Sequence, residues 1–124
     1  MTQRLLAFAA AAALMAAGAA HAQDAAKGKV LFNAQCSLCH SANPGQEGAA
    51  PSLFGVVGRR AGSDPGFTAY TSAIKASGKV WTPATLNVFL SGPAKYIPGT
   101  AMPITLANPD DRRNVIAYLA TLKK

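Results

Sequence analysis

Two cysteines one helical turn apart, with a histidine directly after the second, are the feature that most restricts how this chain can fold. They lie in the segment Cys36-Ser37-Leu38-Cys39-His40. In an exported protein, this C-x-x-C-H spacing is typical of a covalent attachment site for haem. Each thiol can add to one vinyl group while the adjacent imidazole is held under the iron. The motif therefore predicts a fold that wraps around one haem c.

An apolar stretch at the N-terminus indicates export. Arg4 is its only charge, an Ala/Leu-rich run covers residues 5–17, and the segment ends in the small-residue pattern Ala20-His21-Ala22. This arrangement predicts a signal peptide at residues 1–22 and a soluble, periplasmic domain at residues 23–124. The alternative is an uncleaved membrane anchor, but the run is shorter than the ~20 apolar residues that span a bilayer.

The few possible metal ligands that remain after cleavage restrict which cofactor the motif can bind. One histidine, one methionine and two cysteines remain beyond residue 22, namely His40, Met102, Cys36 and Cys39. A structural zinc site needs four ligands, and the domain offers only three Cys or His residues. A disulfide or a redox-active cysteine pair stays open as an alternative, although no βαβ pattern supports a thioredoxin-like fold.

The sixth iron ligand is predicted by elimination. With His40 as the only histidine after residue 22, two histidines cannot ligate the haem within one chain, so Met102 or an open site remains. Met102 lies in the Pro/Gly-bounded loop 96–103, where filling a hydrophobic core explains it less well. Met/His ligation raises the reduction potential and leaves no iron site for oxygen or peroxide. We therefore expect His40 and Met102 to be the metal ligands.

The charge is basic but does not indicate nucleic-acid binding. The chain has 12 Lys and Arg against 5 Asp and Glu, for a net charge of +7, and loss of Arg4 leaves +6. The cations are scattered in pairs without interleaved aromatic residues that would stack on bases. A basic balance favours acidic partners, but the charge alone does not choose among nucleic acid, anionic lipid and an acidic protein face. We expect redox complexes as partners, contact with membranes only through them, and a monomer.

The periodicity predicts an all-α fold with long loops. Capped apolar patterns indicate helices at residues 24–35, 82–91 and 108–124, with a short helix at 71–77. Residues 41–64 contain too many prolines and glycines for a regular element, so this long loop is expected to enclose a cofactor. No strand alternation occurs.

At this point the sequence resembles the bacterial and mitochondrial class I cytochromes c over nearly all of residues 24–124. Gly28 and Phe32 match the family's Gly-x-x-x-aromatic pattern on the first helix. Val115 and Tyr118 match the positions on the last helix against which that pattern packs. The resemblance implies three main helices plus short ones and long loops around one covalent haem.

The resemblance also implies cofactor-binding residues outside the motif. Pro51 matches the proline whose carbonyl accepts the ligand histidine's N–H, and Thr100 matches a position that bonds a haem propionate. Three further residues match those that hold the buried propionates, namely Arg59, Tyr70 and Trp81.

Departures from the family pattern concern the surroundings of the methionine and the exposed haem edge. Phe89 replaces a tyrosine near the methionine sulfur, and Ile104 replaces an aromatic residue after the methionine. Three positions that hold lysines around the haem edge in mitochondrial members are uncharged here, namely Gln35, Ala94 and Ala101, while Lys95 is retained. The docking face is therefore expected to be less basic than in those members.

The function that these expectations favour is electron transport by a protein that is not an enzyme. The first alternative is a haem enzyme or gas sensor, which would need a vacant sixth site in place of Met102. The second is a haem-free redox or structural module that uses Cys36 and Cys39, against which the adjacent His40 argues. Because the chain has modest burial of its own, we also expect the haem-free form to be largely unfolded.

Overall fold

The computed structural model describes residues 23–124, and the predicted signal peptide at 1–22 lies outside this range. Within it the chain forms six helical elements and no strand, with a single isolated antiparallel bridge between Arg60 and Val80. This confirms the predicted all-α class. No helix within the described range is long and apolar enough to cross a membrane.

The first helix is α1, which covers Ala25–Leu31 and continues directly into the π-helical turn η1, Phe32–Cys36. Asp24 caps α1 as predicted, since its carboxylate accepts a hydrogen bond from the Lys27 N–H. The wider turn of η1 was not predicted. It ends at the first cysteine of the motif and so delivers the motif at the end of a continuous helix.

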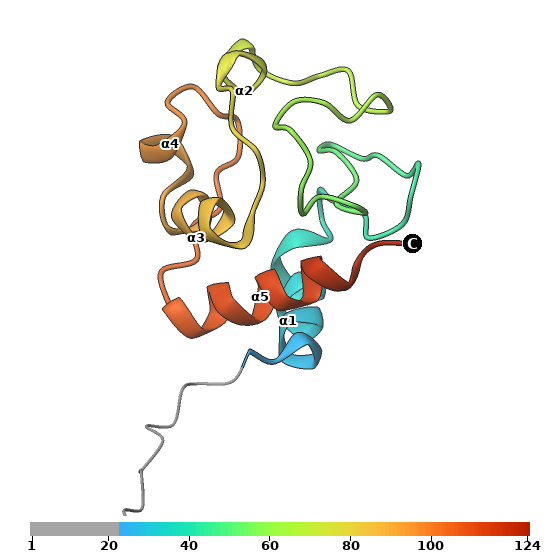
Figure 1. Cartoon of the computed structure of the whole chain (residues 1–124), viewed down its shortest axis with the longest axis vertical. Coiled ribbons are helices and arrows are strands. Elements are labelled where there is room, and N and C mark those ends of the chain that lie inside the picture. The colour runs from blue at the N-terminus through green and yellow to red at the C-terminus, as the bar shows by residue number, and fades with distance from the viewer. Residues whose placement is uncertain (1–22) are drawn as a thin grey trace, which may run out of the picture.

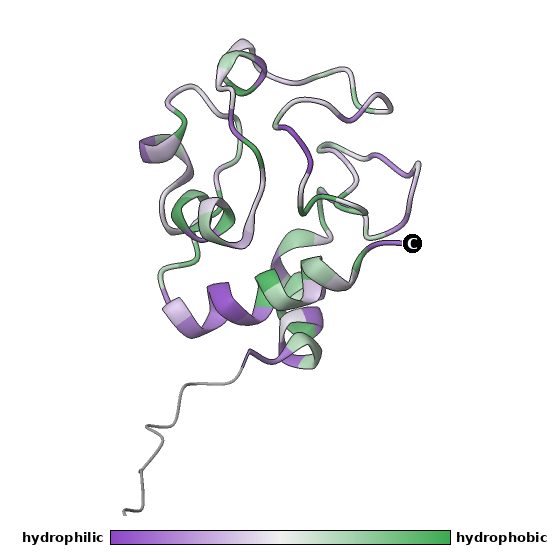
Figure 2. Cartoon of the chain, viewed as in Figure 1, coloured by the Kyte–Doolittle hydropathy of each residue, from purple (hydrophilic) through white to green (hydrophobic). Residues whose placement is uncertain are grey.

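The last helix, α5 (Pro109–Thr121), packs against α1. Asn108 caps it as predicted, with its side-chain oxygen accepting from the N–H groups of Asp110 and Asp111. The helix ends at Thr121, three residues before the end of the predicted range 108–124, so Lys123 and Lys124 lie beyond its last turn. Figure 1 shows α5 crossing α1 at one end of the molecule, and Figure 2 shows apolar residues where the two helices meet.

Close approach at this crossing depends on Gly28. An added Cβ there would collide with the backbone carbonyl of Asn114 and would lie 3.0 Å from Cβ of Tyr118. One turn later the Phe32 and Tyr118 rings pack with centroids 5.3 Å apart. Val115 is 1% exposed beside them. The predicted pairing of the first and last helices is therefore present in the structure.

Three shorter helices follow the long loop: α2 (Ser72–Ala76), α3 (Pro83–Ser91) and α4 (Pro93–Tyr96). Of these, α3 packs against α5, while α2 and α4 lie farther from the crossing (Figure 1). Thr82 caps α3 in a capping box with Thr85, and the buried face of α3 consists of Leu86, Phe89 and Leu90, which are spaced as one helical face in the sequence. The helix ends at Ser91, before Gly92-Pro93, as predicted. Pro93 then begins the short helix α4, which was not predicted, because proline is favoured at the first position of a helix.

The long loop between η1 and α2 is held largely by its own hydrogen bonds. The Ala50 N–H donates to the Cys39 carbonyl and the Leu53 N–H donates to that of Ser41, so residues 41–53 fold back on the motif. This segment occupies the side of the molecule opposite α3 and α4 (Figure 1). The sequence predicted a long loop that could be ordered or disordered here, and the structure has an ordered one.

Candidate haem site

The attachment motif lies where η1 opens into the loop. The His40 N–H donates to the Cys36 carbonyl at 2.9 Å, so the backbone still turns helically through the motif. Cys36 is partly buried, Cys39 is exposed, and neither forms a disulfide. Burial raises the pKa of the Cys36 thiol. Two reduced thiols one turn apart are the donor set that thioether attachment requires.

The imidazole of His40 is fixed by a single backbone contact. Its Nδ1 lies 2.7 Å from the Pro51 carbonyl oxygen. A carbonyl can only accept, so Nδ1 carries the proton and Nε2 keeps its lone pair. Burial lowers the pKa of His40, which favours the neutral ring. A neutral imidazole with a free, oriented Nε2 is suited to bind iron.

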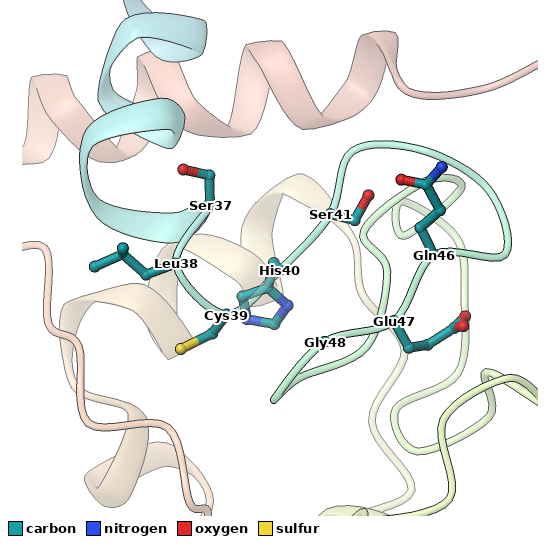
Figure 3. A pocket seen from close by; sticks show the side chains of 8 residues that line it. All are labelled: Ser37, Leu38, Cys39, His40, Ser41, Gln46, Glu47 and Gly48. Atoms are coloured by element: carbon teal, nitrogen blue, oxygen red, sulfur yellow. The ribbon is translucent and has the colours of Figure 1, made fainter.

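A polar pocket lies beside the motif and is lined by residues 37–41 and 46–48. Figure 3 shows Leu38 and the Cys39 sulfur pointing to one side of the chain, with Gln46 and Glu47 across from them. The thiol is therefore turned away from the polar wall of this pocket. This pocket differs from the apolar surface that a porphyrin face would need.

Arg59 forms a second group with the loop around it. Its guanidinium donates from Nη2 to the Ser52 carbonyl at 2.9 Å and from Nη1 to that of Phe54 at 3.3 Å. Its Nε is buried and, within residues 23–124, has no hydrogen-bond partner. A partly buried guanidinium with an unused N–H at its buried Nε fits an anionic group such as a haem propionate.

Asp64 is a member of this group that the sequence reasoning missed. Its Oδ2 lies 3.9 Å from Nη1 of Arg59, and its backbone N–H donates to the hydroxyl of Tyr70 at 3.3 Å. Burial raises the pKa of Tyr70, and the carboxylates of Asp64 and Glu47 act in the same direction. The sequence signal was a carboxylate five residues after Arg59, in the turn-forming sequence Asp64-Pro65-Gly66.

Of the remaining predicted residues, Trp81 is tied to the Arg59 group through its backbone, since its N–H donates to the Arg59 carbonyl at 2.9 Å. Trp81 is buried against Phe89, with ring centroids 4.8 Å apart. Thr100 uses its hydroxyl to accept from the Met102 N–H at 3.4 Å, and Met102 packs partly buried against the hydrophobic core. Pro98 and Gly99 precede them in a loop with no helical residues, as the sequence predicted.

Comparison with known protein families shows to which family a chain with this site belongs. The family model described as Cytochrome c matches residues 25–123. The chain is a member of the cytochrome c family. As a class I c-type cytochrome it binds one covalent haem c, with Cys36 and Cys39 in the attachment spacing, and it is an electron carrier and not an enzyme.

Individual relatives agree with this membership. The chain is 44% identical to cytochrome c of Euglena viridis over 101 residues, covering 81% of this chain and 98% of the relative. It is 44% identical to cytochrome c2 of Rhodopila globiformis over 107 residues, covering 86% and 100%. The solved structure of cytochrome cH from Methylobacterium extorquens is 40% identical and superposes with a TM-score of 0.73, over 79% of this chain and 98% of that one. This confirms the predicted cytochrome c fold.

Proposed function

We propose that this cytochrome is a periplasmic carrier whose haem iron is ligated by His40 and Met102, and that it shuttles single electrons between redox complexes. The observation that carries the proposal is the His40–Pro51 hydrogen bond of 2.7 Å, which leaves Nε2 as the free nitrogen of an oriented imidazole. The haem supplies the one-electron Fe(III)/Fe(II) couple. The chain's residues hold it, orient it and set its surroundings.

Met102 is the residue that we assign to the sixth position. It is the only methionine among the described residues, and its backbone is tied to the Thr100 hydroxyl within a loop that begins with Pro98-Gly99. A thioether ligand stabilises ferrous iron and closes the iron to small ligands. This assignment favours a carrier over a gas sensor or peroxidase.

The propionate contacts belong to the same proposal. Arg59 offers a buried N–H without a partner among residues 23–124, which supports a salt bridge to a propionate. We assign supporting roles to Tyr70, Trp81 and Thr100 from the family resemblance. Tyr70 lies next to the Arg59 group through its contact with Asp64, which supports its place there.

The test of the iron ligands is a visible spectrum of the haem-bearing protein. Ferric haem with methionine bound has a weak charge-transfer band in the red, and we expect it in the native protein and not in Met102→Ala. Thr105→Ala, which changes an exposed residue of the same loop, is the matched control and should keep the band. A native protein that contains haem but lacks the band would overturn Met102 ligation.

Export is proposed from the N-terminal segment, which precedes the described residues. Cleavage after Ala22 would place Gln23 at the start of the mature protein. Cell fractionation of an expressing bacterium, with N-terminal sequencing of the periplasmic protein, tests this. A membrane-bound product that retains Met1 would favour the uncleaved anchor.

A further inference from the structure

Asp64 is a partly buried acidic residue to which the proposed function assigns no role. Its side chain is 12% exposed, and that of Arg59 is 16% exposed. Oδ1 of Asp64 accepts from the Gly66 N–H at 3.1 Å, which fixes the carboxylate within a tight turn. Oδ2 is buried and meets no donor within residues 23–124. The carboxylate is thus held in place by the turn and directed at Arg59.

The distance between the two charges explains why Asp64 leaves the Arg59 guanidinium able to bind another anion. Nη1 of Arg59 and Oδ2 of Asp64 are 3.9 Å apart, beyond hydrogen-bonding range but close enough for strong Coulomb attraction at partial burial. Arg59 Nε stays free of partners in the described chain. Arg59 can therefore bind a further anion while Asp64 offsets part of its charge.

Other charged groups near this turn do not cancel Asp64. The carboxylate of Glu47 lies close to Gly66 and so adds a second negative charge to the same region. The two ion pairs of the described chain are Arg59–Asp64 and Arg113–Asp110, so no second cation pairs with Asp64. One guanidinium thus faces the carboxylate of Asp64 together with any propionate that it binds.

We infer that Asp64 is a positioning residue that lowers the reduction potential of the haem by holding a fixed negative charge against Arg59. The inference rests on the proposed contact of Arg59 with a propionate. Ferric haem carries one more positive charge than ferrous haem, so a fixed anion nearby stabilises the oxidised state. Asp64 also orients the guanidinium through the attraction of its Oδ2.

The experiment measures the midpoint potential of the haem-bearing protein by spectroelectrochemistry. Asp64→Asn removes the charge but keeps an oxygen that can accept from the Gly66 N–H. We expect the equilibrium constant for reduction to rise at least threefold, which is about 28 mV at 59 mV per tenfold change for one electron. Asp110→Asn removes an exposed acidic charge from α5. We expect its shift in midpoint potential to be less than a third of the shift in Asp64→Asn.

Two further variants separate a charge effect from a packing effect. Asp64→Glu keeps the charge, so its potential should stay closer to the native value than that of Asp64→Asn. Equal shifts in the two variants would mean that packing and not charge sets the potential, and the inference would fail. If Asp64→Asn does not fold, Asp64→Ser removes the charge while retaining an oxygen acceptor, and the same rise is expected.

Arg59→Gln separates failure of this inference from failure of the proposed propionate contact. We expect it to lower the potential, because it removes a positive charge beside the haem. A lowered potential in Arg59→Gln with no change in Asp64→Asn overturns the role of Asp64 alone. Unchanged potentials in both variants would show that the propionates lie away from Arg59, which overturns the contact on which the inference rests.

Discussion

The crossing of α1 with α5 and the loop at residues 41–71 are stabilised by different means. At the crossing, apolar side chains do the packing: Phe32 is 2% exposed, Val115 is 1% exposed, and Gly28 lets the two backbones meet. In the loop, a buried serine hydroxyl and backbone hydrogen bonds hold the chain to itself. The crossing is therefore stabilised by hydrophobic packing, whereas the loop is stabilised mainly by hydrogen bonds.

The difference shows which part of the fold depends on the cofactor. The buried apolar residues of the 41–71 loop are Val56 and Ala61, too few to stabilise about thirty residues against their conformational entropy. Haem binding to the folded state adds stability that the loop's own contacts do not provide. We therefore expect the folded state of the loop to depend strongly on bound haem. The packing of α1 on α5 should depend on it least.

Removal of the haem should have the largest effect. Cys36→Ala with Cys39→Ala abolishes covalent attachment, and we expect the purified haem-free protein to lose most of its helical circular dichroism and its cooperative thermal transition. The loop would then have nothing to enclose, and a crossing of two short helices alone is marginal. Ser37→Ala with Leu38→Ala is the matched control because it changes the motif and keeps both thiols. A cooperative melt and native-like dichroism without haem would show that the loop folds by itself.

Phe32→Ala should have the next largest effect and acts on the crossing. Truncating a buried phenylalanine costs about 3–5 kcal/mol, because transfer energy is lost and a cavity is left beside Tyr118. Denaturant unfolding of the haem-bearing protein measures this loss. Val30→Ala, two residues earlier and 70% exposed, should change the free energy of unfolding by less than about 0.5 kcal/mol. Similar losses for the two variants would mean that the crossing contributes little.

The sequence was most informative where short-range rules decide the structure. The side chains of Asp24, Thr82 and Asn108 are placed at helix starts by their type and by the residues after them, and all three accept the capping hydrogen bonds. The buried faces of the helices were also predictable, because the spacing of apolar residues along a helix is a local rule. The attachment motif was predictable because thioether chemistry fixes the distance between the two cysteines.

The features that were missed depend on contacts distant in sequence. The π-helical turn η1 and the short helix α4 were not predicted, because local signals alone did not distinguish a continued helix from an ordinary stop. Asp64 was missed because its side chain serves a turn and, at the same time, a guanidinium that the loop brings back to it. How the Met102 loop faces the motif cannot be predicted from sequence spacing, since no local rule relates residues so far apart.

Ser52→Ala should have the smallest effect of the three and acts on the loop. Ser52 is 2% exposed, and its hydroxyl donates to the Asn43 carbonyl at 2.6 Å while accepting from the Phe54 N–H at 3.2 Å. Alanine would leave both backbone groups without that partner, which costs about 1–3 kcal/mol. Denaturant unfolding gives the total loss, and amide hydrogen exchange should locate it in residues 41–58.

Ser63→Ala is the control for this change. The Ser63 hydroxyl donates to the Arg60 carbonyl at 2.6 Å, but the residue is exposed, so water can replace the bond and the expected loss is below about 0.5 kcal/mol. If Ser52→Ala costs as much as Phe32→Ala, the loop holds more of the stability than its sparse apolar burial suggests. If it costs no more than Ser63→Ala, the buried hydroxyl is dispensable and the haem alone orders the loop.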